Sequence, residues 1–243
     1  MTSKQILISG GTSGIGRAIA VAFASQGDQV VATGVSQVEV QAANVGRSTA
    51  PSYGPIRNEL LDVRSAEQIA RLIATLPRLD VLVNCAGIIR RGGAEHDPAV
   101  FAEVLDVNLT GTMRLCTAAR PLLQASSGCI LNTASMLSFF GSGVAPAYCA
   151  SKGGIAQLTK SLAIAWAAEG IRVNAIAPGW ISTELTRGLT SDEARSAAIL
   201  ARTPMKRWGE PADIGGSIVY LCSDAARFVT GIVLPIDGGY AAM

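Results

Sequence analysis

A tyrosine and a lysine stand four residues apart in this sequence, at Tyr148 and Lys152. On a helix, two side chains with this spacing share one face, and their Cβ atoms lie about 5 to 6 Å apart. A protonated Lys152 would favour the phenolate of Tyr148 and lower the pKa of its phenol, which is about 10 in peptides. Such a phenol can accept a proton from an alcohol and return it to an alkoxide. The pair therefore predicts acid–base chemistry, although a half-buried tyrosine beside a solvated lysine has the same spacing.

A serine is expected next to this pair. Ser135 directly follows the apolar run 129–134, which predicts a buried strand. The serine would then lie at the carboxyl end of that strand, beside the helix that carries Tyr148 and Lys152.

A glycine-rich turn joins the first predicted strand, 6–8, to the first predicted helix, 17–26. Its glycines let the backbone turn tightly and approach a ligand, and the helix N-terminus offers unpaired N–H groups to a pyrophosphate. The turn therefore predicts a dinucleotide-binding loop. Its spacing, Gly-x-x-x-Gly-x-Gly, differs from the Gly-x-Gly-x-x-Gly fingerprint, and a plain glycine-rich turn is the alternative.

Predicted strands and helices alternate along the whole chain. This order predicts an α/β fold, a Rossmann-type, doubly wound parallel sheet of about seven strands with helices on both faces, as one domain over residues 1–243. Residues 37–55 read as a polar loop around a short helix, and Ser65 to Gln68 as a capping box. The polar segment 182–208 follows the sixth strand and is expected to form a substrate lid.

Composition limits the class of protein. The net charge is +2 and there is no basic run, so we expect no nucleic-acid partner. We expect no membrane span, no signal peptide and a cytoplasmic location. The five cysteines lack Cys-x-x-Cys spacing, and no cluster has metal-ligand spacing, so no metal is expected. His96, the single histidine, is interpreted as a surface-loop residue.

The end of the second predicted strand bears on the choice of cofactor. An acidic residue there would bind the ribose 2′-OH of NAD, and an arginine would accommodate the phosphate of NADP. The sequence has Gly34, Val35 and Ser36, which are neither. NAD is favoured because a buried phosphate without a cation is costly, and NADP stays open.

The chain resembles the short-chain dehydrogenase/reductase family over essentially its full length. The residues that carry the resemblance occur in the family's order and spacing: Gly10, Gly14, Gly16, Asp62, Val63, Asn84, Cys85, Ala86, Gly87, Asn108, Ser135, Tyr148, Lys152, Pro178, Gly179, Thr183, Asp237, Gly238 and Gly239. Cys85 departs from the family, which commonly has a second asparagine that braces the central sheet.

The resemblance implies roles for the catalytic residues. Tyr148 would be the general acid/base, Ser135 would hold the substrate oxygen, and Lys152 would bind the nicotinamide ribose. Asn108 would help to hold a water that links Lys152 to solvent, with a packing amide as the alternative.

The cofactor would contact residues from the whole edge of the sheet. Asp62 and Val63 would contact the adenine, and Thr183 the nicotinamide amide or the pyrophosphate. The full expected set is Gly10, Thr12, Ser13, Gly14, Ile15, Gly16, Ser36, Asp62, Val63, Asn84, Ala86, Gly87, Tyr148, Lys152, Pro178, Gly179, Ile181 and Thr183.

Longer stretches resemble the branch of the family that oxidises 2-keto-3-deoxy sugar acids: 84–91, 134–139, 195–200 and 207–209. A sugar acid brings a carboxylate, which Arg90 or Arg91 would bind with two hydrogen bonds. Both arginines could instead be solvated or pair with Glu95 or Asp97, and Arg202 and Arg207 are further candidates. Substrate contacts are also expected from Ser135, Tyr148 and Trp180, with simple packing as the alternative for Trp180.

Other readings stay open. Gluconate 5-dehydrogenase and 3-oxoacyl-carrier-protein reductase share the same core, and a cofactor-sensing binding protein is a non-enzymatic alternative. The resemblance also implies a homotetramer in which helices near 98–124 and 148–169 pack across a two-fold axis. The small or apolar residues Ala156, Leu162, Ala163 and Ala165 permit such packing, though burial within one chain explains them too.

Overall fold

The computed structural model describes residues 3–45 and 55–242. In them, seven parallel strands form one sheet in the order β3-β2-β1-β4-β5-β6-β7. The strands are β1 Gln5–Ser9, β2 Gln29–Gly34, β3 Ile56–Leu60, β4 Val81–Asn84, β5 Cys129–Thr133, β6 Arg172–Pro178 and β7 Val233–Ile236. The predicted α/β fold with a doubly wound parallel sheet is confirmed.

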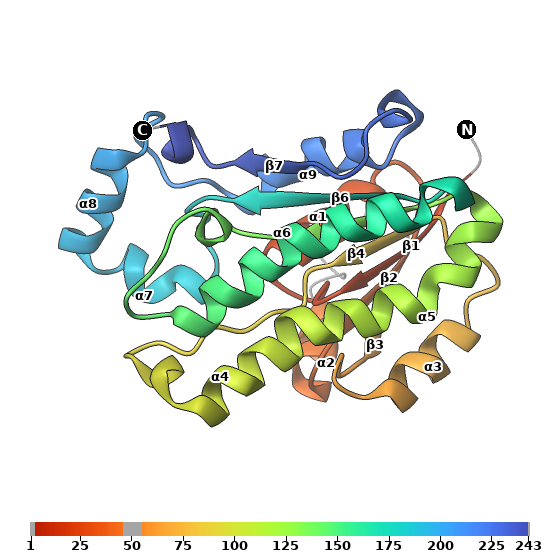
Figure 1. The fold of residues 1–243 in the computed structure, drawn as a ribbon, viewed down its shortest axis with the longest axis horizontal. Helices are drawn as coiled ribbons and strands as arrows, with labels where there is room; N and C mark the ends of the chain where they lie inside the picture. Colours follow the sequence, from red (N-terminus) through yellow and green to blue (C-terminus); the bar gives the residue numbers. More distant parts are fainter. Residues whose placement is uncertain (1–2, 46–54, 243) are drawn as a thin grey trace.

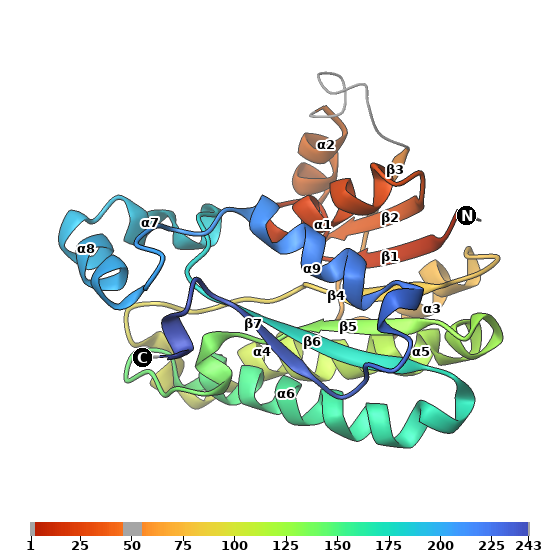
Figure 2. The same cartoon turned by 90° about the horizontal axis from the view of Figure 1, so that it is seen from above.

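Helices cover both faces of the sheet, as Figures 1 and 2 show. One face carries α1 Gly14–Ala24, α2 Gln37–Val45 and α9 Pro211–Leu221, and the other carries α3 Ala66–Ala74, α4 Pro98–Leu105, α5 Gly111–Ser126 and α6 Pro146–Trp166. Successive side chains of a strand point to opposite faces, and helices cover both faces, so the inner strands β1, β2, β4, β5 and β6 are buried on both sides. Ile6 and Ile8 pack against α1 and α9, whereas Leu7 between them packs into the core of α3, α5 and α6.

The strand order reverses between β1 and β4, since β2 and β3 lie on one side of β1 and the later strands on the other. In open parallel sheets, the carboxyl ends of the strands at such a reversal form a crevice that binds ligands. The segment 182–208, predicted to be more than a connector, contains α7 Arg187–Thr190 and α8 Glu193–Arg202. Both helices project beyond the carboxyl ends of the strands (Figures 1 and 2).

Local predictions hold in part. The short helix expected within 37–55 is α2, and residues 46–54 of that loop lie outside the described residues. Ser65 accepts a hydrogen bond from the Gln68 N–H, as a capping residue does, but the Gln68 side chain accepts from the Asp62 N–H. The reciprocal half of the predicted capping box is therefore wrong, because Gln68 fastens the loop after β3 instead.

The helices expected at a tetramer interface use most of their small residues internally. Ala156, Leu162 and Ala163 on α6 are buried within the chain, whereas Ile164 is 82% exposed and Ala165 is also exposed. Intramolecular burial thus accounts for three of the four residues, and the tetramer stays a prediction. No helix among residues 3–45 and 55–242 is both long and apolar enough to cross a membrane.

Candidate active site

A cavity of about 770 Å³ follows the carboxyl ends of the strands from the glycine turn to α6. This volume lies in the range typical of sites for small ligands and cofactors, about 300 to 1,000 Å³. Its lining includes sixteen of the residues predicted to bind cofactor: Gly10, Thr12, Ser13, Gly14, Ile15, Gly16, Asp62, Val63, Ala86, Gly87, Tyr148, Lys152, Pro178, Gly179, Ile181 and Thr183. The fold therefore brings together residues from five parts of the sequence.

The glycine turn is shaped for close approach. Gly10 has a φ of +66°, and a Cβ built on it would lie 2.7 Å from the Ala86 nitrogen at the end of β4. A Cβ on Gly16 would lie 2.1 Å from the Gly10 carbonyl oxygen. Ser13 begins α1 without a side-chain cap, which leaves the first N–H groups of the helix for a ligand. The turn and helix end thus fit the pyrophosphate of a dinucleotide.

Tyr148, Lys152 and Ser135 meet at the other end of this cavity. The Lys152 Nζ lies 5.6 Å from the centre of the Tyr148 ring, so the two side chains share one face of α6 as predicted. Lys152 is only 4% exposed, and its Nζ donates a hydrogen bond of 2.6 Å to the Thr133 carbonyl oxygen at the end of β5. The Ser135 side chain lies close enough to the Tyr148 hydroxyl to lower its pKa, and both residues line the cavity. The serine and the tyrosine can therefore bind the same substrate oxygen.

Burial sets the charge state of this cluster. The pKa of Tyr148 is raised, mainly because burial disfavours the phenolate; the Ser135 side chain and the charge of Arg91 lower it. Burial also lowers the pKa of Lys152 to about 8, so its charge is lost as the pH rises through that value. The direction for Tyr148 is opposite to the one predicted from the Tyr148–Lys152 spacing, because desolvation outweighs the neighbouring charges.

Asn108 connects three elements beneath the catalytic cluster. It lies in a π-helical turn, Asp106–Thr110, between α4 and α5 and is 1% exposed. Its side-chain amide accepts from the Ile88 N–H at 2.8 Å and donates to the Ile88 carbonyl and the Ser151 hydroxyl. A Cβ on Gly87 would come within 3.3 Å of Asn108 Oδ1 and 3.6 Å of Lys152 Nζ. Asn108 thus holds the backbone that follows β4 in place. Gly87, in that segment, lies next to both Asn108 and Lys152.

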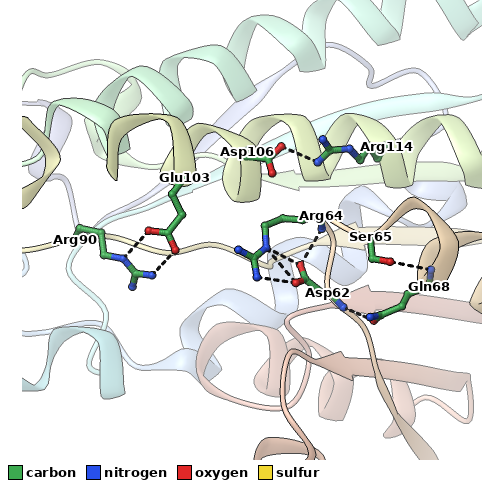
Figure 3. Close-up of polar contacts among 8 residues, drawn as sticks. All are labelled: Asp62, Arg64, Ser65, Gln68, Arg90, Glu103, Asp106 and Arg114. Atoms are coloured by element: carbon green, nitrogen blue, oxygen red, sulfur yellow. Dashed lines mark hydrogen bonds and ion pairs between the residues drawn. The ribbon is translucent and has the colours of Figure 1, made fainter. Parts of the chain in front are cut away.

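Two ion pairs, Asp62–Arg64 and Glu103–Arg90, are formed by residues that line the cavity (Figure 3). Arg64 binds both carboxylate oxygens of Asp62 at 2.7 to 3.1 Å and holds the pKa of Asp62 below its usual range. Arg90 pairs with Glu103 at 2.8 Å rather than with Glu95 or Asp97. The guanidiniums of Arg64 and Arg90 therefore already have carboxylate partners.

Two carboxylates that the sequence did not reveal lie at decisive positions. Glu39, in the first turn of α2, lines the cavity and accepts a hydrogen bond from the Val35 N–H at 3.1 Å, just after β2. Glu95 is fully buried and accepts hydrogen bonds of 2.8 Å from the N–H groups of Arg90 and Tyr148. Since Tyr148 lies in the first turn of α6, Glu95 caps the helix that carries the tyrosine.

Two residues predicted to bind cofactor, Ser36 and Asn84, lie outside the cavity lining, whereas Cys85 is part of it. The Ser36 hydroxyl accepts from the Glu39 N–H and helps to begin α2. Asn84 is buried and donates to Asn132 Oδ1 at 2.9 Å, so it braces β4 against β5. At the position where the family commonly has a second asparagine, the Cys85 thiol contacts the Thr133 hydroxyl, and burial raises its pKa to about 11.

The remaining substrate candidates surround the catalytic end. Arg91 donates to the Leu185 carbonyl at 2.8 Å and so joins the loop after β4 to the segment before α7. Trp180 packs edge-on against Trp208 and Tyr240. His96 is exposed and contacts the Gly143 carbonyl, consistent with a surface residue.

Comparisons with known proteins agree with this geometry. A family model described as enoyl-(acyl carrier protein) reductase matches residues 10–241. The chain is 41% identical to the 2-dehydro-3-deoxy-D-gluconate 5-dehydrogenase of Bacillus subtilis, over 99% of this chain and 95% of the relative. It is 38% identical to the protein of the same name from Pseudoalteromonas atlantica, over 99% and 96%.

A solved structure resembles the whole chain. The gluconate 5-dehydrogenase of Burkholderia cenocepacia in complex with NADP and tartrate is 31% identical, covers 100% of this chain and 97% of its own, and superposes with a TM-score of 0.91. The family match, the relatives and the cavity lead to one assignment. The chain belongs to the short-chain dehydrogenase/reductase family and is an NAD(P)-dependent dehydrogenase that acts on CH–OH groups.

Proposed function

We propose that this protein oxidises a secondary hydroxyl of a 2-keto-3-deoxy sugar acid, such as 2-keto-3-deoxygluconate, and that NAD accepts the hydride. The observation that carries the proposal is the meeting of Tyr148, Ser135 and Lys152 at one end of a dinucleotide-sized cavity. The relatives named 2-dehydro-3-deoxy-D-gluconate 5-dehydrogenase, at 38% and 41% identity, support the substrate class.

The residues divide the chemistry between them. The Ser135 hydroxyl binds the substrate oxygen, and the Tyr148 phenolate accepts its proton as the C–H bond gives its hydride to the nicotinamide. The Lys152 Nζ, which donates to the Thr133 carbonyl oxygen, contributes positive charge beside the tyrosine ring when it is protonated. In the reverse direction the Tyr148 phenol returns the proton to the alkoxide that forms from the ketone.

The end of β2 favours NAD. The Glu39 carboxylate lies beside Val35, and a Cβ on Gly34 would meet Glu39 Oε2 at 2.9 Å and Thr12 Oγ1 at 2.7 Å. A carboxylate has acceptor sites beyond the one that Val35 uses, so it can bind ribose hydroxyls. The same charge would repel a 2′-phosphate, and the arginines lining this cavity, Arg64 and Arg90, are engaged by Asp62 and Glu103.

The Glu39→Gln variant is expected to lose preference for NAD. The ratio of kcat/KM with NAD to kcat/KM with NADP should fall about tenfold or more, because a charged acceptor is lost for NAD and a repulsion is removed for NADP. Steady-state kinetics with both cofactors measure this ratio. Glu67→Gln is the control, since that exposed carboxylate pairs with Arg71 on α3 and lies outside the cavity lining. A wild-type protein that prefers NADP, or an unchanged ratio in Glu39→Gln, would refute the assignment.

We also propose that residues 182–208 act as a lid of the single domain. Thr183 faces the glycine turn, since a Cβ on Gly14 would lie 3.7 Å from its methyl group, and Arg91 holds the Leu185 carbonyl. These contacts connect the segment to the glycine turn and to the loop that follows β4. A lid of this kind would exclude water while hydride is transferred.

A substrate screen tests the proposed function. Purified protein is mixed with NAD or NADP and with 2-keto-3-deoxygluconate, D-gluconate or a 3-hydroxyacyl thioester, and reduced nicotinamide is followed by its near-ultraviolet absorbance. We expect the highest kcat/KM with the 2-keto-3-deoxy acid. Faster turnover of D-gluconate would favour a gluconate 5-dehydrogenase, and faster turnover of the thioester an acyl reductase. Cofactor binding without turnover of any alcohol would favour the binding-protein alternative.

A further inference from the structure

A second cavity, of about 110 Å³, opens beside the catalytic end of the first. Ser135, Pro178 and Gly179 line both cavities, so the two meet at the serine that is proposed to bind the reacting oxygen. The far wall of the small cavity is formed by Phe140, Trp180, Arg202 and Tyr240. A substrate whose hydroxyl lies at Ser135 can therefore extend another part of its chain toward these residues.

Arg202, the last residue of α8, is held by aromatic rings. Its guanidinium carbon lies 4.3 Å from the centre of the Tyr240 ring and 5.0 Å from that of Phe140. Its Nη1 donates to the Tyr240 hydroxyl at 3.2 Å. Trp180 packs edge-on against Tyr240 at 6.2 Å, and Trp208, at 6.0 Å from Trp180, donates to Ser196 on α8. Rings that face a cation in this way fix its position without neutralising its charge.

The other arginines considered as ligands of the substrate carboxylate already have hydrogen-bond partners within the protein. Arg90 makes two hydrogen bonds to Glu103, and Arg207 makes two to Asp213. Arg91 donates to the Leu185 carbonyl. Throughout residues 3–45 and 55–242, no acidic side chain forms an ion pair with Arg202. A guanidinium has five N–H donors, of which the contact with Tyr240 uses one.

We propose that Arg202 binds the carboxylate of the substrate and thereby selects sugar acids over neutral polyols. This inference rests on the proposed function and names the side chain that recognises the substrate carboxylate. A guanidinium matches a carboxylate with two parallel hydrogen bonds, and the aromatic walls restrict the rotation of its side chain. The Phe140, Trp180 and Tyr240 rings also provide apolar surface for the C–H groups between the carboxylate and the reacting hydroxyl.

Calorimetric titration of the NADH-loaded protein tests the inference without requiring turnover. D-gluconate and D-glucitol have the same hydroxyl pattern but differ in one end group, a carboxylate or a hydroxymethyl. The wild-type protein is expected to bind D-gluconate more tightly. In Arg202→Gln the affinity for D-gluconate should fall about 10- to 100-fold, the loss typical of a hydrogen-bonded charge, while that for D-glucitol should not change. Arg202→Lys, which keeps the charge but not the paired donors, should be intermediate.

Arg207→Gln is the matched control. It also removes an arginine charge, but one that Asp213 already neutralises. It should bind D-gluconate as the wild type does. Equal affinities of the wild type for D-gluconate and D-glucitol, or an unchanged D-gluconate affinity in Arg202→Gln, would overturn the assignment. An equal loss for both ligands would show that Arg202 only supports the fold of the wall. If Arg202 binds D-gluconate as expected while no sugar acid is oxidised, the proposed function fails and this inference stands.

Discussion

The Tyr148→Phe variant is expected to lower kcat by about 10²- to 10⁴-fold, the usual contribution of a general acid or base. The change removes one hydroxyl and keeps a ring of the same shape in a half-buried position. The glycine turn and the end of β4 are untouched, so the affinity for NADH should stay near that of the wild type. Absorbance kinetics and a fluorescence titration with NADH measure the two quantities separately.

The pH dependence of the oxidation rate of the wild type and of Tyr148→Phe provides a second measurement. Oxidation requires the phenolate, and burial raises the pKa of Tyr148, so the wild-type rate should increase as pH rises above neutral. The charged and polar groups that shift this pKa are Ser135 and Arg91, which lower it, and Glu95 and Cys149, which raise it. The small residual rate of Tyr148→Phe should lack this rise.

Tyr220→Phe is the matched control, because Tyr220 lies on α9 with 46% exposure and outside the lining of both cavities. It should retain wild-type kinetics. Near-normal turnover in Tyr148→Phe would remove the tyrosine from its proposed role.

The Gly16→Ala variant is expected to lose most of its cofactor affinity. The new Cβ would lie 2.1 Å from the Gly10 carbonyl oxygen and 2.9 Å from its carbon, so the start of α1 and the glycine turn must move apart. Both segments offer the groups expected to bind the pyrophosphate. We expect the Kd for NADH to rise at least about tenfold and the stability to fall by about 1 to 3 kcal/mol, the cost typical of overpacking. Fluorescence titration and thermal unfolding check the two effects.

Gly216→Ala separates this clash from the general effect of alanine in a helix. Gly216 lies within α9, and a Cβ built on it has no neighbouring atom within 4 Å. Alanine there should stabilise the protein by about 0.5 to 1 kcal/mol and leave the Kd for NADH unchanged. A Gly16→Ala protein with wild-type affinity would show that the close contact at the turn is unimportant for binding.

The fold could be predicted because its signals are local. Most strands contain a short apolar run such as Ile6 to Ile8. Some helices begin at a recognisable capping residue such as Asp97, whose side chain accepts from Ala99 and Val100. The position of Lys152 against the Tyr148 ring follows from helix geometry alone. Spacing along one element was sufficient for these predictions.

The partners of charged side chains could not be predicted in this way. Arg90 pairs with Glu103, thirteen residues later on α4, rather than with nearby Glu95, because the packing of α4 decides the contact. Glu95 instead reaches the Tyr148 N–H, 53 residues away. Such choices depend on how elements pack, which a single sequence does not display.

Glu39 and the pKa of Tyr148 show two further limits. An acidic residue was sought within Gly34 to Ser36, yet the carboxylate comes from the first turn of the next helix and folds back to Val35. The signal available in the sequence was an acidic residue, Glu39, in the first turn of the helix that follows β2. The pKa of Tyr148 was predicted from one neighbouring charge, whereas the extent of burial, which only the structure gives, determines its direction.

The fate of the substrate hydrogen tests the central claim most directly. A 2-keto-3-deoxy sugar acid that carries deuterium on its secondary carbinol carbons is incubated with the protein and NAD, and the reduced cofactor is analysed by mass spectrometry. If this protein transfers hydride from the alcohol carbon to NAD, the nicotinamide ring will carry deuterium and the oxidised hydroxyl will become a second keto group of the sugar acid. Reduced cofactor without deuterium, or no reduction at all, would contradict the account.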